Sequence, residues 1–208
     1  MKLKICGMKY PDNISQVAQL QPDYLGFIFH ERSPRHFEEK IPALSDQIQK
    51  VGVFVDEKVE FISGQIDKHK LSAIQLHGHE SPETCRLLKS SGVNVLKVFS
   101  IKNEFDFSVL TPYEEVCDYF LFDTKGKLPG GNGYRFDWSV LEQYRSTKPF
   151  FLSGGIGLYQ IENLKHFQNS KASKFCHAID VNSQFEIEPG FKDIQLLQEF
   201  KSQLCVTT

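Results

Sequence analysis

The chain has 208 residues, of which 40% are hydrophobic, and its formal net charge is -2 at pH 7. This length can bury one sizeable core and is short for two ordinary domains, so we expect a single domain over residues 1–208. The near-neutral charge lacks the basic excess of proteins that bind phosphate backbones, which argues against a nucleic-acid partner.

The cysteines are odd in number and widely spaced, and they include no C-x-x-C pair that would indicate a zinc site or a redox motif. A reduced, cytoplasmic protein is the expectation. The first residues, MKLKICGMKYPDN, contain no sustained apolar region, and no apolar run approaches the roughly 20 residues that span a bilayer. We therefore expect an unprocessed protein with no membrane partner.

Short apolar, β-branched or aromatic runs recur along the chain and predict strands. In chain order they are LKICG (3–7), YLGFIF (24–29), VGVFVD (51–56), AIQLHG (73–78), VLKVFS (95–100), YFLFDT (119–124), FFLSGG (150–155) and HAIDVN (177–182). They begin about every 25 residues, which leaves room for one helix and two short loops between strands.

Apolar residues at three- and four-residue spacing predict helices in most of the gaps, over 13–20, 60–69, 81–92, 136–145 and 158–167. Ser81 followed by Pro82 and Glu83 is typical of a helix start, and Gly92 suits the end of that helix. Eight alternating units favour an α/β fold with a closed parallel sheet, the (β/α)₈ barrel.

Chemistry in such a barrel is assembled where the carboxyl ends of the strands meet. Polar residues and glycines stand at those ends here: Cys6, Asp56, His77, Asp123, Gly154, Gly155, Asp180 and Asn182. Asp56 and Asp137 are more typical of helix starts than of catalytic groups. The others are candidates for one site.

Cys6 and Asp123 are the candidate base and acid. Lys4 lies two residues before Cys6 on the same side of the strand, and a nearby cation lowers a thiol pKa. Asp123 closes an aromatic strand, where desolvation favours the neutral acid. Each has an ordinary alternative, because free cysteines are usually buried hydrophobes and strand-end aspartates often cap loops or helices.

Anion binding is expected at the segment SGGIG (153–157), where small residues let backbone N–H groups approach a phosphate, with Ser183 nearby. A tight strand-to-helix turn is the alternative. Arg35 can pair with a substrate carboxylate or remain a solvated arginine, and His77 can bind substrate or be structural. The glycine-rich segment at 125–135 is either a lid over the site or a plain flexible loop.

The sequence resembles the phosphoribosylanthranilate isomerases from end to end. The shared motifs are KICGM (4–8), DYLGFIFHERSPR (23–35), VGVFVD (51–56), IQLHGHE (74–80), FLFDT (120–124), GGNGYRFDW (130–138), LSGGIG (152–157) and DVNSQFE with PGFKD (180–193). The resemblance implies an Amadori rearrangement of a small phosphorylated aminoaldose in tryptophan biosynthesis, without metal or organic cofactor, by a monomer or homodimer.

Residue by residue, the resemblance implies that Cys6 is the general base and Asp123 the general acid. It places Arg35 on the anthranilate carboxylate, and it makes His77 and Asp180 substrate contacts. Backbone groups for the phosphate would come from Gly154, Gly155 and Ser183. The chain departs from the family pattern at Asn132, where threonine is usual, and at Asn182, where serine is usual; both changes bear on phosphate affinity.

Two other functions compete with this one. The analogous Amadori isomerase of histidine biosynthesis uses a catalytic pair that resembles two aspartates, and Cys6 argues against it. A noncatalytic phosphometabolite-binding barrel is the second, and the presence of both Cys6 and Asp123 argues against that.

Overall fold

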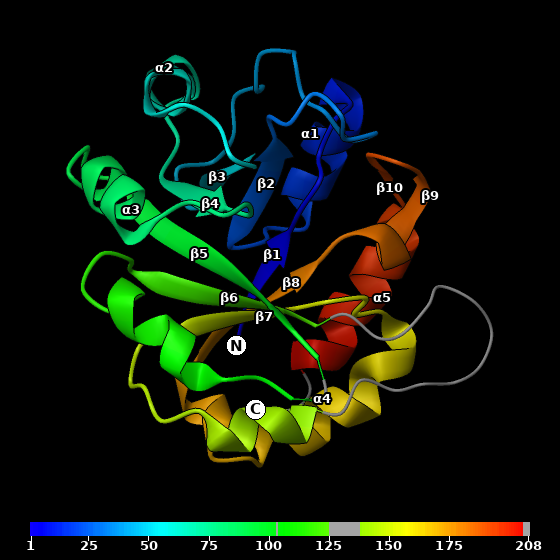
Figure 1. The fold of residues 1–208 in the computed structure, drawn as a ribbon. Coiled ribbons are helices and arrows are strands. Elements are labelled where there is room, and N and C mark those ends of the chain that lie inside the picture. The colour runs from blue at the N-terminus through cyan, green and yellow to red at the C-terminus, as the bar shows by residue number, and fades with distance from the viewer. Residues whose placement is uncertain (103, 125–137, 206–208) are drawn as a thin grey trace.

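A computed structural model of the chain describes residues 1–102, 104–124 and 138–205. Eight parallel strands pair in chain order and close into a barrel (Figure 1). They are β1 (Lys2–Ile5), β2 (Tyr24–Ile28), β3 (Gln49–Phe54), β4 (Ala73–Leu76), β5 (Asn94–Ile101), β6 (Tyr119–Thr124), β7 (Phe150–Ser153) and β8 (Cys176–Val181). Each lies in one of the predicted runs or overlaps it, so the predicted (β/α)₈ barrel is confirmed.

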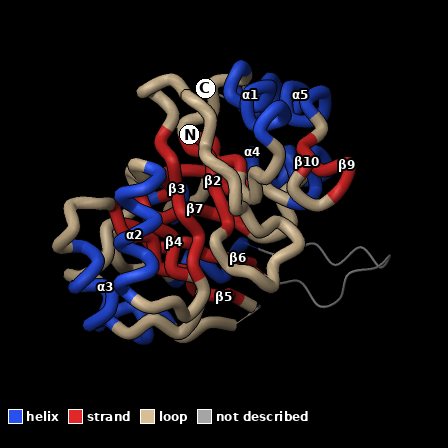
Figure 2. The backbone as a smooth tube through the Cα atoms, turned by 90° about the horizontal axis from the view of Figure 1, so that it is seen from above, coloured by secondary structure: helices blue, strands red, loops and turns tan. Residues whose placement is uncertain are grey.

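Helices lie outside the strands, with α2 beside α3 and α4 beside α5 (Figure 2). They are α1 (Pro11–Gln19), α2 (Val59–His69), α3 (Pro82–Lys89), α4 (Ile161–Gln168) and α5 (Ile194–Cys205). The 3₁₀ turns are η1 (Phe107–Tyr113), η2 (Trp138–Gln143), η3 (Leu158–Gln160), η4 (Ala172–Phe175) and η5 (Ser183–Phe185), and β9 (Glu186–Glu188) pairs with β10 (Phe191–Lys192). No helix in the described part of the chain is long and apolar enough to cross a membrane.

The predicted start of α3 is confirmed, since the Ser81 hydroxyl accepts from the Thr84 N–H at 3.2 Å. The prediction that Asp56 starts a helix is wrong. Lys58 is the N-cap of α2, and Asp56 has φ of +52° and accepts hydrogen bonds from the backbone and ring of His79. The predicted helix over 136–145 is a 3₁₀ turn where it is described, over Trp138–Gln143.

Because side chains alternate along a strand, each strand sends every second residue into the barrel. An inner apolar layer fills the middle of the barrel, and it consists of Tyr24, Val51, Ala73, Leu96, Val98, Leu121, Phe151 and Ala178. Two residues further along three of these strands lie polar side chains: Gln75 and Asp180 are buried, and Asp123 is half-buried. The barrel interior therefore changes from apolar to polar toward the carboxyl ends of its strands.

Candidate active site

A cavity of about 210 Å³ lies at the carboxyl ends of the strands. Its lining includes most of the predicted site residues, namely Cys6, His77, Asp123, Gly154, Gly155, Asp180 and Ser183, together with Gln75, Ser153, Asn182 and Gln184. Arg35 is not among the lining residues. The structure thus brings the sequence candidates from β1, β4, β6, β7 and β8 to one place.

Cys6 follows β1 and is 4% exposed. Its sulfur fits because the neighbouring strand carries Gly26: a Cβ added there would lie 2.7 Å from the Cys6 Sγ. Burial raises the pKa of the thiol above its usual value, and the nearby Lys4 only partly offsets this. Lys4 lowers the pKa of Cys6, as expected, but the net shift is upward because desolvation outweighs the effect of one cation.

Lys4 is fully buried and shares its charge among several groups. Its Nζ lies 2.9 Å from Oδ1 of Asp180 and donates to Oε1 of Gln75 at 2.7 Å. Burial raises the pKa of Asp180 although Lys4 opposes the shift. Because the Lys4 ammonium already pairs with Asp180, it stabilises the thiolate form of Cys6 less than an unpaired cation would.

Asp123 lies near the end of β6 with its side chain 18% exposed. Its Oδ2 is 3.7 Å from Nε2 of His77. The aromatic walls expected from its own strand are absent from the site, because Phe120 and Phe122 belong to the outer core, between the strands and the helices. The group that faces the carboxylate at the mouth of the barrel is the imidazole of His77.

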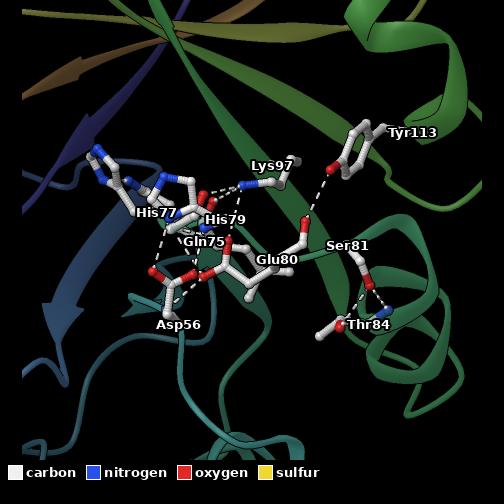
Figure 3. Close-up of polar contacts among 11 residues, drawn as sticks. Asp56, Gln75, His77, His79, Glu80, Ser81, Thr84, Lys97 and Tyr113 are labelled. Carbon is white, nitrogen blue, oxygen red and sulfur yellow. Dashed lines mark hydrogen bonds and ion pairs between the residues drawn. The ribbon is translucent and has the colours of Figure 1, made fainter.

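The loop that carries His77 is fixed by a buried ion pair (Figure 3). Lys97 on β5 lies 2.9 Å from Oε2 of Glu80 and also donates to the Gly78 carbonyl at 2.8 Å. Glu80 in turn accepts from the N–H groups of Asp56 and Gly78. These contacts leave the loop after β4 little freedom, so the position of His77 is well defined.

The predicted phosphate segment forms the turn after β7. Gly154 and Gly155 have φ of +109° and +63°, which L-residues with side chains rarely adopt. Ser183 begins the turn η5 after β8 and lines the same cavity. Gly154, Gly155 and Ser183 line one cavity together, and backbone N–H groups of such small residues suit a small anion.

Arg35, the predicted carboxylate ligand, contacts a glutamate of the chain itself. Its Nε donates to both carboxylate oxygens of Glu186, at 2.8 and 3.0 Å, and its Nη2 lies 2.5 Å from Oε2 of the same residue. Glu186 also pairs with the buried Lys192 at 2.6 Å, and Lys192 donates to Oδ1 of Asn182 at 2.7 Å. Glu186 therefore holds Arg35 beside the loop after β1, where its Cδ abuts Gly7.

Within the described ranges, no three His, Cys, Asp or Glu side chains are grouped so that they could hold a metal ion. The predicted lid over 125–135, Asn132 and Asp137 lie outside the described residues.

Sequence reasoning missed Gln75 and the Lys97–Glu80 pair. Both had a signal: Gln75 interrupts the apolar run AIQL, and Lys97 interrupts VLKVF. A polar residue within a buried strand needs a partner, and partners here lie up to 71 positions away in sequence. Glu186 had no comparable signal because, although it stands in the motif DVNSQFE and begins β9, it does not interrupt a buried apolar strand.

A closed parallel barrel with polar groups around a cavity at the carboxyl ends of its strands defines a (β/α)₈-barrel enzyme. The family model described as N-(5'-phosphoribosyl)anthranilate (PRA) isomerase matches residues 3–203. The chain belongs to this family and is an isomerase of tryptophan biosynthesis.

Individual relatives agree over the whole length. The N-(5'-phosphoribosyl)anthranilate isomerase of Parabacteroides distasonis is 45% identical, with 98% of this chain and 93% of the relative covered. That of Phocaeicola vulgatus is 42% identical, with 98% of each covered. The solved structure of phosphoribosyl anthranilate isomerase from Thermotoga maritima is 31% identical and superposes with a TM-score of 0.82 over 99% of each chain.

Proposed function

We propose that the chain converts N-(5'-phosphoribosyl)anthranilate into 1-(2-carboxyphenylamino)-1-deoxyribulose 5-phosphate, with Cys6 as general base and Asp123 as general acid. The observation that carries the proposal is that both groups line one cavity of about 210 Å³. They reach it from separate strands, next to glycines suited to a phosphate.

The reaction requires two proton transfers at different atoms. Asp123 donates its proton to the furanose ring oxygen, which opens the ring and leaves a protonated Schiff base. Cys6, as thiolate, removes the proton from C2. The electron pair of that C–H bond forms the C1–C2 double bond, and the π pair of the C=N bond moves to the iminium nitrogen and neutralises it. The resulting enolamine then tautomerises to the aminoketose, so the overall change is an isomerisation.

The raised pKa of Cys6 fits the removal of a proton from carbon. The thiolate is the minor form at neutral pH, yet a thiolate of high pKa is a stronger base once formed. Lys4 stabilises the thiolate because its charge is close and lowers the pKa from the value that burial alone would produce.

Different residues are proposed to bind the phosphate, the sugar and the anthranilate carboxylate of the substrate. Gly154, Gly155 and Ser183 are proposed to hold the phosphate through backbone N–H groups, and His77 and Asp180 to contact the sugar. Arg35 is proposed to meet the anthranilate carboxylate while Glu186 keeps its guanidinium in place. In support, a related structure that is 27% identical was solved in complex with reduced 1-(o-carboxyphenylamino)-1-deoxyribulose 5-phosphate.

The test is turnover by the purified chain, followed as loss of anthranilate-substrate fluorescence. We expect turnover of N-(5'-phosphoribosyl)anthranilate, and we expect it to persist after dialysis against EDTA. We expect no turnover of the aminoaldose of histidine biosynthesis. Turnover of the second substrate alone would support the competing isomerase, and binding without turnover would support a noncatalytic barrel.

We also propose that the enzyme is cytoplasmic and works as a monomer or homodimer without a cofactor. The free thiols of Cys6, Cys85, Cys117 and Cys176 support a reducing compartment. A dimeric relative from Thermotoga maritima supports the homodimer as one of the two states. Sedimentation equilibrium of the purified chain distinguishes them.

A further inference from the structure

A continuous line of polar contacts crosses the mouth of the barrel from Asp180 to Asp123. Asp180 pairs with Lys4 at 2.9 Å, and Lys4 donates to Gln75 at 2.7 Å. The Gln75 amide nitrogen lies 3.3 Å from Nδ1 of His77, whose Nε2 lies 3.7 Å from the Asp123 carboxylate. Gln75 is the middle member and is 2% exposed.

The orientation of the Gln75 amide follows from the chemistry of Lys4. A lysine ammonium has three donors and no acceptor, so the amide oxygen must face it. The amide nitrogen must then face His77, as Figure 3 shows for the two side chains. An amide nitrogen can only donate, and therefore Nδ1 of His77 must be the acceptor.

A neutral imidazole carries one proton, so an accepting Nδ1 places the proton on Nε2. We infer that Gln75 is a positioning residue for the acid: it holds His77 as the Nε2–H tautomer, with that N–H directed at the Asp123 carboxylate. This inference rests on the proposed role of Asp123.

The tautomer matters because Asp123 becomes a carboxylate as it gives up its proton. An N–H directed at the developing negative charge stabilises it, whereas a nitrogen lone pair in the same place repels it. Gln75 lines the cavity, and the contacts that join it to Asp123 run through His77. Lys4 therefore serves both halves of the site, since it lies beside Cys6 and also fixes the Gln75 amide.

The tautomer can be read directly from side-chain nitrogen chemical shifts of uniformly ¹⁵N-labelled protein, with the His77 signals assigned by their loss in His77→Gln. We expect Nε2–H in the wild-type protein at a pH where the ring is neutral. In Gln75→Glu the side chain can only accept, so we expect Nδ1–H. Wild-type protein with Nδ1–H would overturn the inference whether or not Gln75→Glu folds.

The kinetic constants of Gln75 variants distinguish a positioning role from a purely structural one. Gln75→Glu should lower kcat by about tenfold with KM little changed, less than the roughly hundredfold typical of an oxyanion donor because the 3.7 Å separation is long. In a His77→Ala background the same substitution should change kcat no further. Equal effects in both backgrounds would show that Gln75 does not act through His77.

The two proposals fail in different ways. If the wild-type chain does not turn over the anthranilate substrate, the proposed function is wrong while the nitrogen shifts still decide the tautomer. If turnover is normal and wild-type His77 carries its proton on Nδ1, the inference about Gln75 is wrong and the proposed function stands.

Discussion

At the scale of single residues, the pKa of Cys6 depends on whether burial, which raises it, or the charge of Lys4, which lowers it, is the larger effect. Lys4 lies close to Cys6, as the two-residue spacing predicted, but burial of the thiol outweighs it and the pKa rises. Asp123 is likewise where its strand predicted, yet the group that faces it is His77, on the loop after β4. Spacing predicts which side chains share a face, and it does not predict how deeply they are buried.

The ionisation of Cys6 follows from these contacts. We expect the thiol to titrate above its usual value of 9.0, and Asp180→Asn to lower this pKa, because the Asp180 charge raises it and Lys4 would then face the sulfur alone. The measurement is the thiolate absorbance near 240 nm as a function of pH, taken as the difference between the wild-type protein and Cys6→Ser. A wild-type titration near neutral pH would contradict the account.

The space occupied by the Cys6 sulfur gives a second prediction. Gly26→Ala places a methyl 2.7 Å from Sγ, so the sulfur must move, and a shift of about 1 Å can cost roughly a hundredfold in rate. We expect kcat to fall while the circular dichroism spectrum is kept. Gly64→Ala is the control, because its methyl meets nothing within 4 Å and should leave kcat unchanged.

At the scale of elements, the sequence predicted the strands and most of the helices, and it did not predict the short irregular elements. The eight strands followed from short apolar, β-branched or aromatic runs, and the N-terminus of α3 followed from capping chemistry. The helix α5 was not predicted although Ile194, Leu197, Phe200 and Leu204 have helical spacing, and the 3₁₀ turn η2 was predicted as a full helix. The β9–β10 hairpin was missed because its stability comes from contacts with distant parts of the chain.

Glu186 on β9 shows this dependence and gives a pH prediction. Burial opposes its ionisation, but Arg35 and Lys192 outweigh burial and hold the pKa of Glu186 below its usual value. A lowered carboxyl pKa adds stability that is present above the unfolded-state pKa, near 4.5, and is lost as pH falls through the folded-state pKa.

We therefore expect Glu186→Gln to lower the free energy of unfolding by about 3 kcal/mol at pH 7, because it leaves buried Lys192 with less compensation. The difference from wild type should shrink below pH 4.5. Urea unfolding at several pH values measures both. A difference that stays constant with pH would mean that the charge of Glu186 is not what stabilises the hairpin.

At the scale of the whole molecule, closure of the barrel brings residues that are far apart in the sequence together in one site. Cys6, His77, Asp123 and Asp180 come from four strands, and only closure brings them to one cavity. The sequence could predict this because every candidate ended a strand of a parallel barrel. It could not predict the contacts that join them, such as Lys4 to Gln75, because these depend on register and burial across the barrel.

The most direct measurement is the kcat of Cys6→Ala and Asp123→Asn with N-(5'-phosphoribosyl)anthranilate. We expect each to lose about a hundredfold or more, as is typical when a general acid or base is removed, with the fold retained. Cys176→Ala and Asp46→Asn, which lie outside the cavity lining, are the matched controls and should turn over normally. A folded Cys6→Ala or Asp123→Asn enzyme with near wild-type kcat would contradict the role proposed for that residue.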